Sequence, residues 1–400
     1  MKVALTVSCF GEELLSGAER YALKLAEALG RQGSELYVFS SQAVSPLTWE
    51  NRLPSREQLG GAEVQRFPVI HRRMRRTFGL LKRFVFSLQR WQPRLYRQWA
   101  SYLDLWLLRT QGPWCPALWS ELQRQQLRFD ALIAVGYLFA PTFYALQKFS
   151  GPRVFIPTAH DEREFGWSFV GKSMSRANAF GFLSYAERQV CTRYWPATGD
   201  APHVMVPPGL EANADWEETL QQKLPERFFL CFGRVERGKG IELLYRQVPP
   251  DVRFVVAGRQ GHRFPNDQRF LFIGPVSEGQ KVWLHRRTLA LVVPSQSESY
   301  SMVTANAIAL KTPVIGLQGC AAVEELITQY GGRLCPPEQL GALLTEIWSG
   351  HIGVLEHPLL SDRIRQERSW TTSAQRMLAL IQDLVRLQPQ GQLSRNRASQ

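Results

Sequence analysis

The chain has 400 residues, 44% of them hydrophobic and 21% charged, with a formal net charge of +13. This length is too great for one compact core, and the composition excludes a disordered chain. Six scattered cysteines lack metal-ligand or redox spacing, which favours reduced, buried thiols. No signal-peptide pattern opens the sequence, and the longest uncharged stretch, 131–147, is too short and too broken to span a membrane. We therefore expect a cytoplasmic protein.

Apolar strands alternate with amphipathic helices along the whole chain, a pattern typical of parallel sheets covered by helices on both faces. The predicted strands are 2–7, 36–40, 64–67, 131–135, 153–158, 227–232, 253–258, 271–273, 289–293 and 313–316. The predicted helices are 17–29, 140–149, 239–247, 280–287, 301–310, 337–349 and 371–387. A stretch rich in proline and acids, 206–226, predicts a boundary. We expect an α/β fold with two doubly wound domains, 1–205 and 206–367, and a polar tail over 388–400.

Two loops of the N-terminal half carry candidate ligand contacts. The first strand leads through a loop to a helix that begins at Gly17, where glycine either lets a ligand approach the backbone or marks an ordinary turn. His160 and Asp161 follow the strand 153–158 and can donate to and accept from sugar hydroxyls. The alternative for His160 is a structural histidine with satisfied hydrogen bonds.

The segment 71–110 carries ten arginines and lysines against one acid, Asp104, and so holds +9 of the +13. On a helix over 80–91, the apolar residues that share one face are Leu80, Leu81, Phe84, Val85, Leu88 and Trp91. Basic charge with interfacial tryptophans is typical of a helix on an anionic membrane, which we favour. One alternative is a helix packed on its own sheet with solvated arginines. Nucleic acid is not expected as a partner, because no reading motif accompanies the charge.

A glycine-rich turn, 233–240, joins the strand 227–232 to the next helix. Arg234 and Lys239 can converge on one anion, and Gly233 lets the backbone approach a phosphate. Solvated bases on a surface loop are the alternative. Because the turn lies at the carboxyl end of a strand, where open α/β sheets bind ligands, we favour a phosphate site.

The stretch 291–315 contains a second strand end with polar residues. Glu298 lies among serines after the strand 289–293, and a helix follows whose free N–H groups favour an anion. A carboxylate that can accept from sugar hydroxyls, beside a helix N-terminus that can bind phosphate, predicts a nucleotide-sugar site. The candidate donor contacts in this stretch are Ser295, Glu298, Tyr300, Ser301, Met302 and Asn306.

Several common phosphate and metal motifs are absent from the sequence. There is no Asp-x-Asp, no Gly-x-x-x-x-Gly-Lys-Ser/Thr and no Gly-x-Gly-x-x-Gly. We therefore expect no metal and no cofactor, with bound phosphate neutralised by protein bases and helix dipoles.

Together these residues resemble the retaining, GT-B-fold glycosyltransferases of family 4, the glycosyl transferases group 1. The motifs that carry the resemblance are Gly17-Ala-Glu-Arg20 with 31–39 behind it, His160-Asp-Glu162, Val206-Pro-Pro-Gly209, Gly233-Arg234 with Lys239-Gly240, and Pro294-Ser295 with Glu298 and Pro313-Val-Ile315. The resemblance covers most of the chain.

The resemblance implies two Rossmann-like domains facing across a cleft, with the nucleotide-sugar bound mainly by the C-terminal one and a final helix, about 368–388, crossing back to the first domain. It implies that Arg234 and Lys239 hold the donor diphosphate. It also implies that Glu298 binds the donor sugar, that Gly17 lines the phosphate site and that His160 faces the sugar near the reacting carbon. The implied catalytic residues are therefore Glu298, His160, Arg234 and Lys239.

Three positions depart from the family pattern. Asn306 stands where a second glutamate normally accepts from the ribose hydroxyls, so one carbonyl acceptor remains but the charge is lost. Ser301 and Lys311 stand where glycines are usual.

The sequence thus predicts a metal-independent, retaining glycosyltransferase of the EC 2.4 type. We expect it to move a sugar from a nucleotide-sugar to a glycan or lipid-linked acceptor in cell-envelope polysaccharide or glycolipid biosynthesis, peripherally on the cytosolic face of the membrane. The alternative is a catalytically weakened relative that binds a glycan or a partner at the membrane surface.

Overall fold

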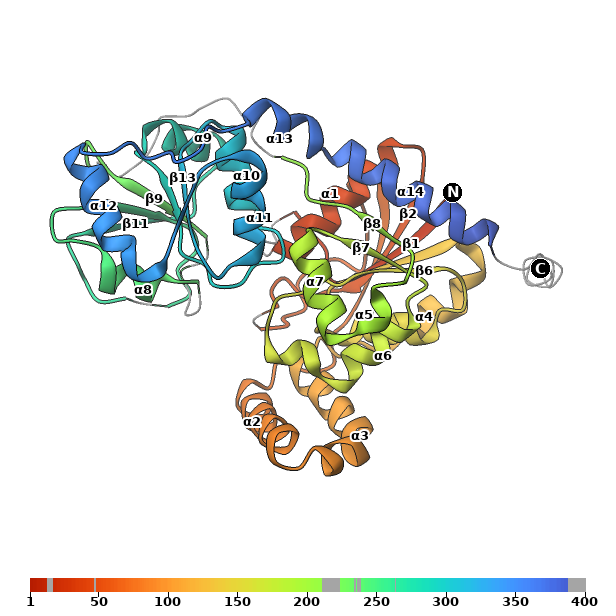
Figure 1. Ribbon diagram of the computed structural model, residues 1–400. Coiled ribbons are helices and arrows are strands. Elements are labelled where there is room, and N and C mark those ends of the chain that lie inside the picture. The colour runs from red at the N-terminus through yellow and green to blue at the C-terminus, as the bar shows by residue number, and fades with distance from the viewer. Residues whose placement is uncertain are drawn as a thin grey trace. The chain divides into compact units, whose positions relative to one another are not determined.

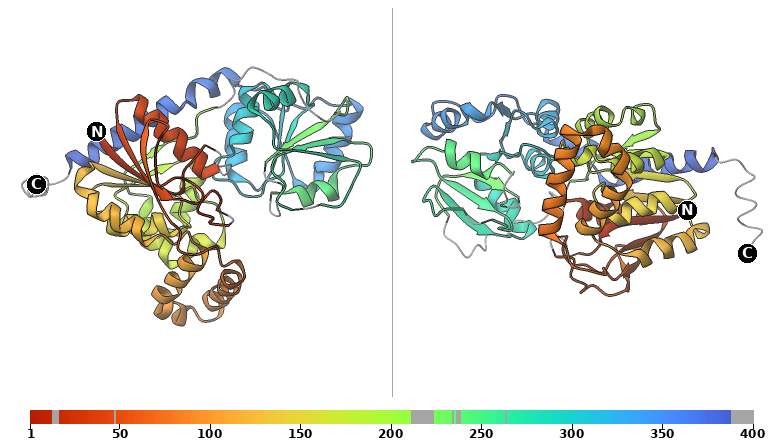
Figure 2. Two further views of the ribbon diagram at one scale, coloured as in Figure 1. Left: turned by 180° about the vertical axis from the view of Figure 1, so that it is seen from behind. Right: turned by 90° about the horizontal axis from the view of Figure 1, so that it is seen from below.

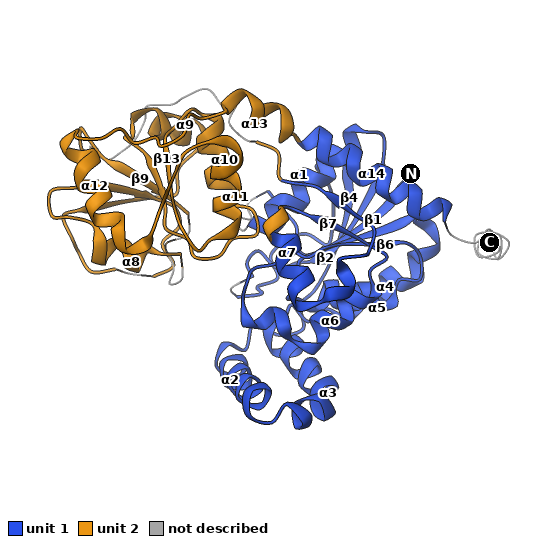
Figure 3. Cartoon of the chain, viewed as in Figure 1, with its two compact units in different colours: residues 1–183, 187–207, 370–400 blue, residues 184–186, 208–369 orange. Residues whose placement is uncertain are grey.

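The chain folds as two compact units. The computed structural model describes residues 1–12, 17–46, 48–210, 224–233, 235, 239–262 and 264–387. The first unit joins residues 1–183, 187–207 and 370–400, and the second comprises 184–186 and 208–369 (Figure 3). The boundaries expected after residues 205 and 367 each lie two residues before those of the structure. The predicted tail, 388–400, lies outside the described residues.

The described residues of the first unit form an eight-stranded sheet in the order β3-β4-β2-β1-β5-β6-β7-β8. All neighbouring strands are parallel except β3 and β4. The central strands are buried on both faces, which explains their unbroken apolar sequences. The strands are β1 (Lys2–Cys9), β2 (Glu35–Ser41), β3 (Arg56–Leu59), β4 (Ala62–Phe67), β5 (Ala131–Val135), β6 (Arg153–Ile156), β7 (Ala179–Phe182) and β8 (His203–Met205).

Helices cover both faces of this sheet (Figures 1 and 2). On one face α1 packs against α14, the last described helix, where the rings of Tyr21 and Trp370 lie 5.5 Å apart. The hydroxyl of Ser373 donates to the carbonyl of Pro207 at 2.7 Å. On the other face lie α4 and α5, with α6 against α5. The helices are α1 (Gly17–Arg31), α2 (Arg75–Trp91), α3 (Pro93–Gln111), α4 (Pro116–Gln125), α5 (Ala140–Lys148), α6 (Ser168–Arg176), α7 (Tyr185–Tyr194) and α14 (Trp370–Arg386).

The helices α2 and α3 form a hairpin that projects from the first unit (Figure 1). Its base is fixed by polar contacts to the body of the unit. Lys172 of α6 binds the buried Asp104 at 2.8 Å, and the hydroxyl of Tyr96 accepts from the backbone N–H of Ser168 at 3.0 Å. Lys82 of α2 forms an ion pair with Glu164. These contacts hold the hairpin in one orientation on the unit.

The apolar face predicted for residues 80–91 is split between the core and the surface. Val85 is fully buried, and Leu81 and Leu88 pack against the core cluster. The aromatic and aliphatic side chains of the hairpin that are more than half exposed are Leu80, Phe84, Trp91, Trp99, Tyr102 and Trp106. The residues predicted to share one face thus divide between the core and the surface, because the helix contacts the core along only part of that face. None of the described helices has the length and apolar character of a membrane span.

The described residues of the second unit form a six-stranded parallel sheet in the order β11-β10-β9-β12-β13-β14. The strands are β9 (Phe229–Phe232), β10 (Phe254–Ala257), β11 (Phe270–Gly274), β12 (Leu291–Val293), β13 (Val314–Leu317) and β14 (Arg333–Cys335). The helices are α8 (Ile241–Gln247), α9 (Glu278–Arg287), α10 (Met302–Ala309), α11 (Ala321–Tyr330), α12 (Leu340–Ser349) and α13 (Ser361–Glu367).

The core of the second unit lies between this sheet and the helices α8 and α12. Alternate strand residues such as Phe229, Phe254 and Ile315 meet Leu244 of α8 and Leu344 of α12. On the opposite face α10 and α11 contact β12 and β13. Both units are therefore doubly wound and Rossmann-like, and the predicted fold class is confirmed.

Candidate functional site

The candidate site of the second unit lies where the strand order reverses, between β9 and β12. In open α/β sheets ligands bind at such a switch point, beyond the carboxyl ends of the strands. The loops that leave β9 and β12 carry Lys239 and Glu298, whose Nζ and Oε1 atoms form an ion pair of 2.9 Å. The side chains are 26% and 21% exposed, so the pair is shielded but reachable from solvent. Arg234, the other predicted diphosphate ligand, lies outside the described residues.

Glycines allow these loops to pack backbone against backbone. Gly240 has a φ of 80°, and a Cβ placed on it would lie 1.9 Å from the carbonyl oxygen of Pro294. Gly258, after β10, would place a Cβ 1.9 Å from the carbonyl oxygen of Gly233. No other residue fits at either position without moving the neighbouring loop. Gly233 itself has a φ of 136°, and no described atom lies within 4 Å of a Cβ built on it; its role beside a phosphate stays a prediction.

Two helices begin beside the Lys239–Glu298 pair. The helix α10 begins after Ser301, and α11 begins after Cys320 at the end of β13. Their free N–H groups add positive potential at this edge of the sheet. The Cys320 thiol is buried close to the pair, and burial raises its pKa to about 11, with Glu298 adding to the shift. It is therefore a neutral packing group, in agreement with the reduced, buried thiols that the sequence predicts.

The remaining predicted donor contacts occupy the loop and first turns that follow β12. Ser295 is buried, and Met302 is the first residue of α10. Tyr300 is also buried, and its hydroxyl has no hydrogen-bond partner among the described residues. Asn306 lies one turn further along α10 and is half-buried. A buried hydroxyl without a partner is a group that a bound ligand can satisfy.

Both departures from the family's glycines occur where the backbone is left-handed. Ser301 has a φ of 69° and Lys311 a φ of 61°. This conformation costs a non-glycine residue roughly 1–2 kcal/mol, which explains the usual glycines. The N–H of Lys311 donates to Ile308 and that of Thr312 to Ala307, so the chain keeps a tight helix C-terminus despite the strain.

The predicted residues of the first unit lie at the carboxyl edge of its own sheet. Gly17 begins α1 directly after the loop that follows β1, and Glu19 in the first turn accepts from the Ser8 hydroxyl at 2.8 Å. His160 and Asp161 follow β6. Asp161 pairs with Arg193 of α7 at 2.5 Å, and His160 is half-buried. The structure thus groups the predicted residues by sheet edge, and their individual roles stay predictions.

A buried carboxyl group supports the loop that carries His160. The two carboxyl oxygens of Glu187 accept from the backbone N–H groups of Ala159 and Leu183 at 2.7 and 2.6 Å. Burial raises the pKa of Glu187 to about 8, although these N–H donors oppose the shift. Thr158, in the same loop, has a strained φ of 52°. Glu187 therefore fixes a backbone conformation that the loop would not adopt alone.

Within the described ranges, no three His, Cys, Asp or Glu side chains gather as a metal site requires. Independence from metal stays a prediction, because it concerns the reaction and not the side chains alone.

Comparison with known proteins gives a family match that lies within the second unit. Residues 213–349 match the family model of the glycosyl transferases group 1. The predicted resemblance to this group is confirmed over these residues, whereas assignment to family 4 stays a prediction. At the level of reaction class, the same match supports the expected glycosyltransferase of the EC 2.4 type. No curated protein matches the chain in sequence.

The whole chain also resembles solved structures. Sucrose-phosphate synthase from Thermosynechococcus elongatus is 16% identical, with a TM-score of 0.64 over 96% of this chain and 98% of that chain. Anabaena HepE, solved with UDP-glucose, is 14% identical, with a TM-score of 0.61 over 96% of this chain and 100% of that chain. The lipopolysaccharide outer core galactosyltransferase WaaB is 12% identical, with a TM-score of 0.58 over 96% and 99%. At these identities the likeness establishes the fold alone.

The close approach at Gly240 gives the first prediction. Gly240→Ala and Gly350→Ala both place alanine at a φ near 80°, but only Gly240 faces a backbone atom, since nothing lies within 4 Å of a Cβ on Gly350. We expect Gly350→Ala to lower the free energy of unfolding by roughly 1 kcal/mol and Gly240→Ala by clearly more. Urea unfolding of both variants measures the difference, and equal losses would contradict the close approach.

The support of the His160 loop gives the second prediction. In Glu187→Gln the amide has one acceptor for two N–H donors, so we expect a loss of about 1–3 kcal/mol in the free energy of unfolding. Glu63→Gln, on the exposed surface of β4, is the control and should change little.

The stability difference between wild type and Glu187→Gln should depend on pH. Because the pKa of Glu187 is raised from 4.5 to about 8, its stabilising contribution is complete below pH 4.5 and is lost as the pH rises through 8. The difference in free energy of unfolding between wild type and Glu187→Gln should therefore decrease between pH 4.5 and 8. Chemical unfolding at several pH values would measure it. An increase of this difference with pH would contradict a protonated Glu187 in the folded protein.

Proposed function

We propose that the chain is a retaining glycosyltransferase that moves a sugar from a nucleotide-sugar to a glycan or lipid-linked acceptor at a membrane surface. The observation that carries the proposal is the Lys239–Glu298 ion pair at the switch point of the second unit's sheet. It combines a cation for phosphate with a carboxylate for hydroxyls, beside the first turn of α10. This is the set of groups that a sugar diphosphate requires.

The proposed reaction places negative charge on the leaving diphosphate, next to the cationic groups of the site. The acceptor hydroxyl attacks the anomeric carbon from the side that the diphosphate leaves, so a carbon–oxygen bond forms as the bond to the phosphate oxygen breaks. The acceptor's proton passes to the leaving diphosphate. Lys239, Arg234 and the N–H groups of α10 stabilise the negative charge that develops on the diphosphate. Glu298 holds the sugar hydroxyls, and His160 faces the sugar. We propose that no metal takes part, because Lys239 and helix N-termini supply the positive charge.

The hairpin α2–α3 supports a location at a membrane. Its exposed aromatic side chains lie among arginines, and the Arg90 guanidinium lies 5.1 Å from the ring centre of Trp91. Each cation near an anionic lipid surface contributes about 1 kcal/mol, and tryptophan favours the interfacial layer. The fixed base of the hairpin turns this surface outward as one unit. We place the protein peripherally on the cytosolic face of the membrane, in cell-envelope polysaccharide or glycolipid biosynthesis.

Asn306 favours a second candidate, a catalytically weakened relative that binds a glycan or partner at the membrane. Its amide supplies one neutral acceptor where the family has a carboxylate. Donor binding without turnover would support this candidate over the first.

The donor site gives the third prediction. We expect one of the UDP-, GDP- or ADP-sugars to bind the purified protein in a calorimetric titration and to be turned over with an acceptor extract. Arg234→Ala and Lys239→Ala should each reduce transfer by about 10²-fold, because each removes a donor to the developing charge. Lys281→Ala is the matched control, since Lys281 is also paired with a glutamate, Glu278 on α9. Near wild-type turnover in both site variants would refute the assignment.

The membrane surface gives the fourth prediction. Vesicles containing phosphatidylglycerol should carry the protein upward in a flotation gradient at 0.15 M salt, whereas vesicles of phosphatidylcholine alone should not. A variant with Phe84, Trp91 and Trp106 changed to serine should lose binding, because these side chains are more than half exposed. Leu127→Ser, which alters an exposed apolar residue outside the hairpin, is the control. No flotation of the wild type would exclude the membrane.

A further inference from the structure

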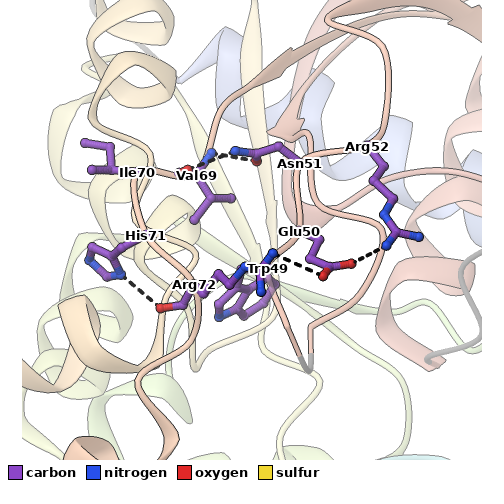
Figure 4. Close-up of a pocket in the computed structure, with 8 residues that line it drawn as sticks. All are labelled: Trp49, Glu50, Asn51, Arg52, Val69, Ile70, His71 and Arg72. Carbon is purple, nitrogen blue, oxygen red and sulfur yellow. Dashed lines mark hydrogen bonds and ion pairs between the residues drawn. The ribbon is translucent and has the colours of Figure 1, made fainter.

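A polar pocket of about 360 Å³ lies in the first unit, lined by residues that the sequence analysis did not select. Its walls are two segments, 49–52, which follows β2, and 69–72, which joins β4 to α2. Figure 4 shows the eight lining side chains. Since β2 and β4 are parallel neighbours, both segments leave the sheet at its carboxyl edge, where open α/β sheets bind ligands.

The walls of the pocket are rigidly joined. The Asn51 side chain bonds the Val69 backbone in both directions, accepting from its N–H and donating to its carbonyl, each at 2.9 Å (Figure 4). Trp49 is buried, and its ring N–H donates to the carbonyl of Gln111 at the end of α3, at 2.7 Å. Trp49 also has a φ of 58°, a strained conformation for a bulky residue. Such strain persists where the surroundings fix it, often at ligand sites.

The pocket has more hydrogen-bond donors than its own acceptors can satisfy. Glu50 is paired with Arg52 at 2.8 Å and lies 3.6 Å from Arg72 (Figure 4). Two guanidiniums carry about ten N–H groups, whereas one carboxylate offers about four lone pairs. The arginine side chains are 69% and 81% exposed. Most of their donors are therefore open to an incoming anion.

Two nitrogens, one in the pocket wall and one on the residue that follows it, are buried without partners. The Nε2 atom of His71 is buried and has no hydrogen-bond partner among the described residues, and neither has the Nε atom of Arg73. The Arg73 side chain is held by the carbonyl of Pro46 at 3.1 Å and by Gln111 at 2.9 Å. Burial and the neighbouring Arg75 lower the pKa of Arg73, as expected for a cation without a balancing acid.

We propose that this pocket binds a phosphate or diphosphate ester of the acceptor, gripped by Arg52 and Arg72. The inference rests on the proposed function, because it assigns the anion to the acceptor. Its volume falls within the usual range of ligand pockets, roughly 300–1,000 Å³. When the ester binds, Glu50 gives up its arginine partners, since carboxylate and phosphate compete for the same donors.

A neutral sugar fits the pocket less well. Sugar hydroxyls need acceptors as well as donors, and both polar atoms of the Asn51 side chain are already engaged by Val69. A phosphate uses donors alone, which is what the arginines supply. The segment 69–72 also leads directly into α2, so a phosphate carried on a lipid would be held next to the hairpin proposed to lie on the membrane.

The fifth prediction tests the pocket with inorganic pyrophosphate. Calorimetric titrations use the full chain with Lys239→Ala, which weakens binding at the donor site. In this background we expect Arg52→Gln and Arg72→Gln each to weaken binding by about fivefold or more. Glu50→Gln should tighten binding by about threefold, because it removes the competing carboxylate. Arg31→Gln on α1, an exposed arginine paired with Glu27, is the control.

A gain of affinity in Glu50→Gln cannot arise from misfolding, so it separates binding from structural damage. Equal pyrophosphate affinity in all these variants, or no gain with Glu50→Gln, would overturn the pocket as a phosphate site. Because the titration needs neither donor nor turnover, its failure is distinct from failure of the proposed transferase.

Vesicles distinguish the two sources of the ester. If the ester is carried on a lipid, flotation should prefer phosphatidic acid over phosphatidylglycerol in the wild type, and Arg72→Gln should lose that preference. Pyrophosphate binding without the lipid preference would support a soluble phosphate ester.

Discussion

The close contact between Gly240 and the carbonyl of Pro294 is the constraint on which the candidate donor site depends. It brings the loop after β9 against the loop after β12, and these are the loops that carry Lys239 and Glu298, whose side chains form the ion pair. The reversal of strand order between β9 and β12 provides the space beside them. Backbone packing of the two loops therefore positions Lys239 and Glu298, and their ion pair is a consequence of that packing.

Much of this arrangement could be predicted from the sequence, because strands buried on both faces are unbroken apolar runs. The strand 131–135 was predicted with the bounds that the structure gives, and the polar residues after 289–293 indicated a strand end. The strands β3, β7, β8 and β14 were missed, since three or four residues carry too little periodicity. Glu187 was also missed, because its role depends on burial and on backbone groups of other segments.

The α2–α3 hairpin and the residues Ser301 and Lys311, which stand where the family has glycines, show where the sequence pattern alone is ambiguous. Periodicity found the apolar side of α2 but could not separate Val85, which meets the core, from Phe84, which is exposed. Both residues satisfy the same helical spacing. Likewise, sequence comparison marked positions 301 and 311 as unusual, but only the backbone angles gave the reason. The strain at Ser301 falls at the start of α10, beside the groups proposed to hold the donor.

The packing of α14 on α1 means that the first unit is built from both ends of the described chain, with the second unit inserted between them. During synthesis the sheet of the first unit emerges long before the helix that covers part of one face. Tyr21 and the neighbouring apolar side of α1 therefore remain without Trp370 until the second unit has been made. The second unit is nearly continuous in sequence and has no such delay, so the order of completion on the ribosome is the reverse of the order along the chain.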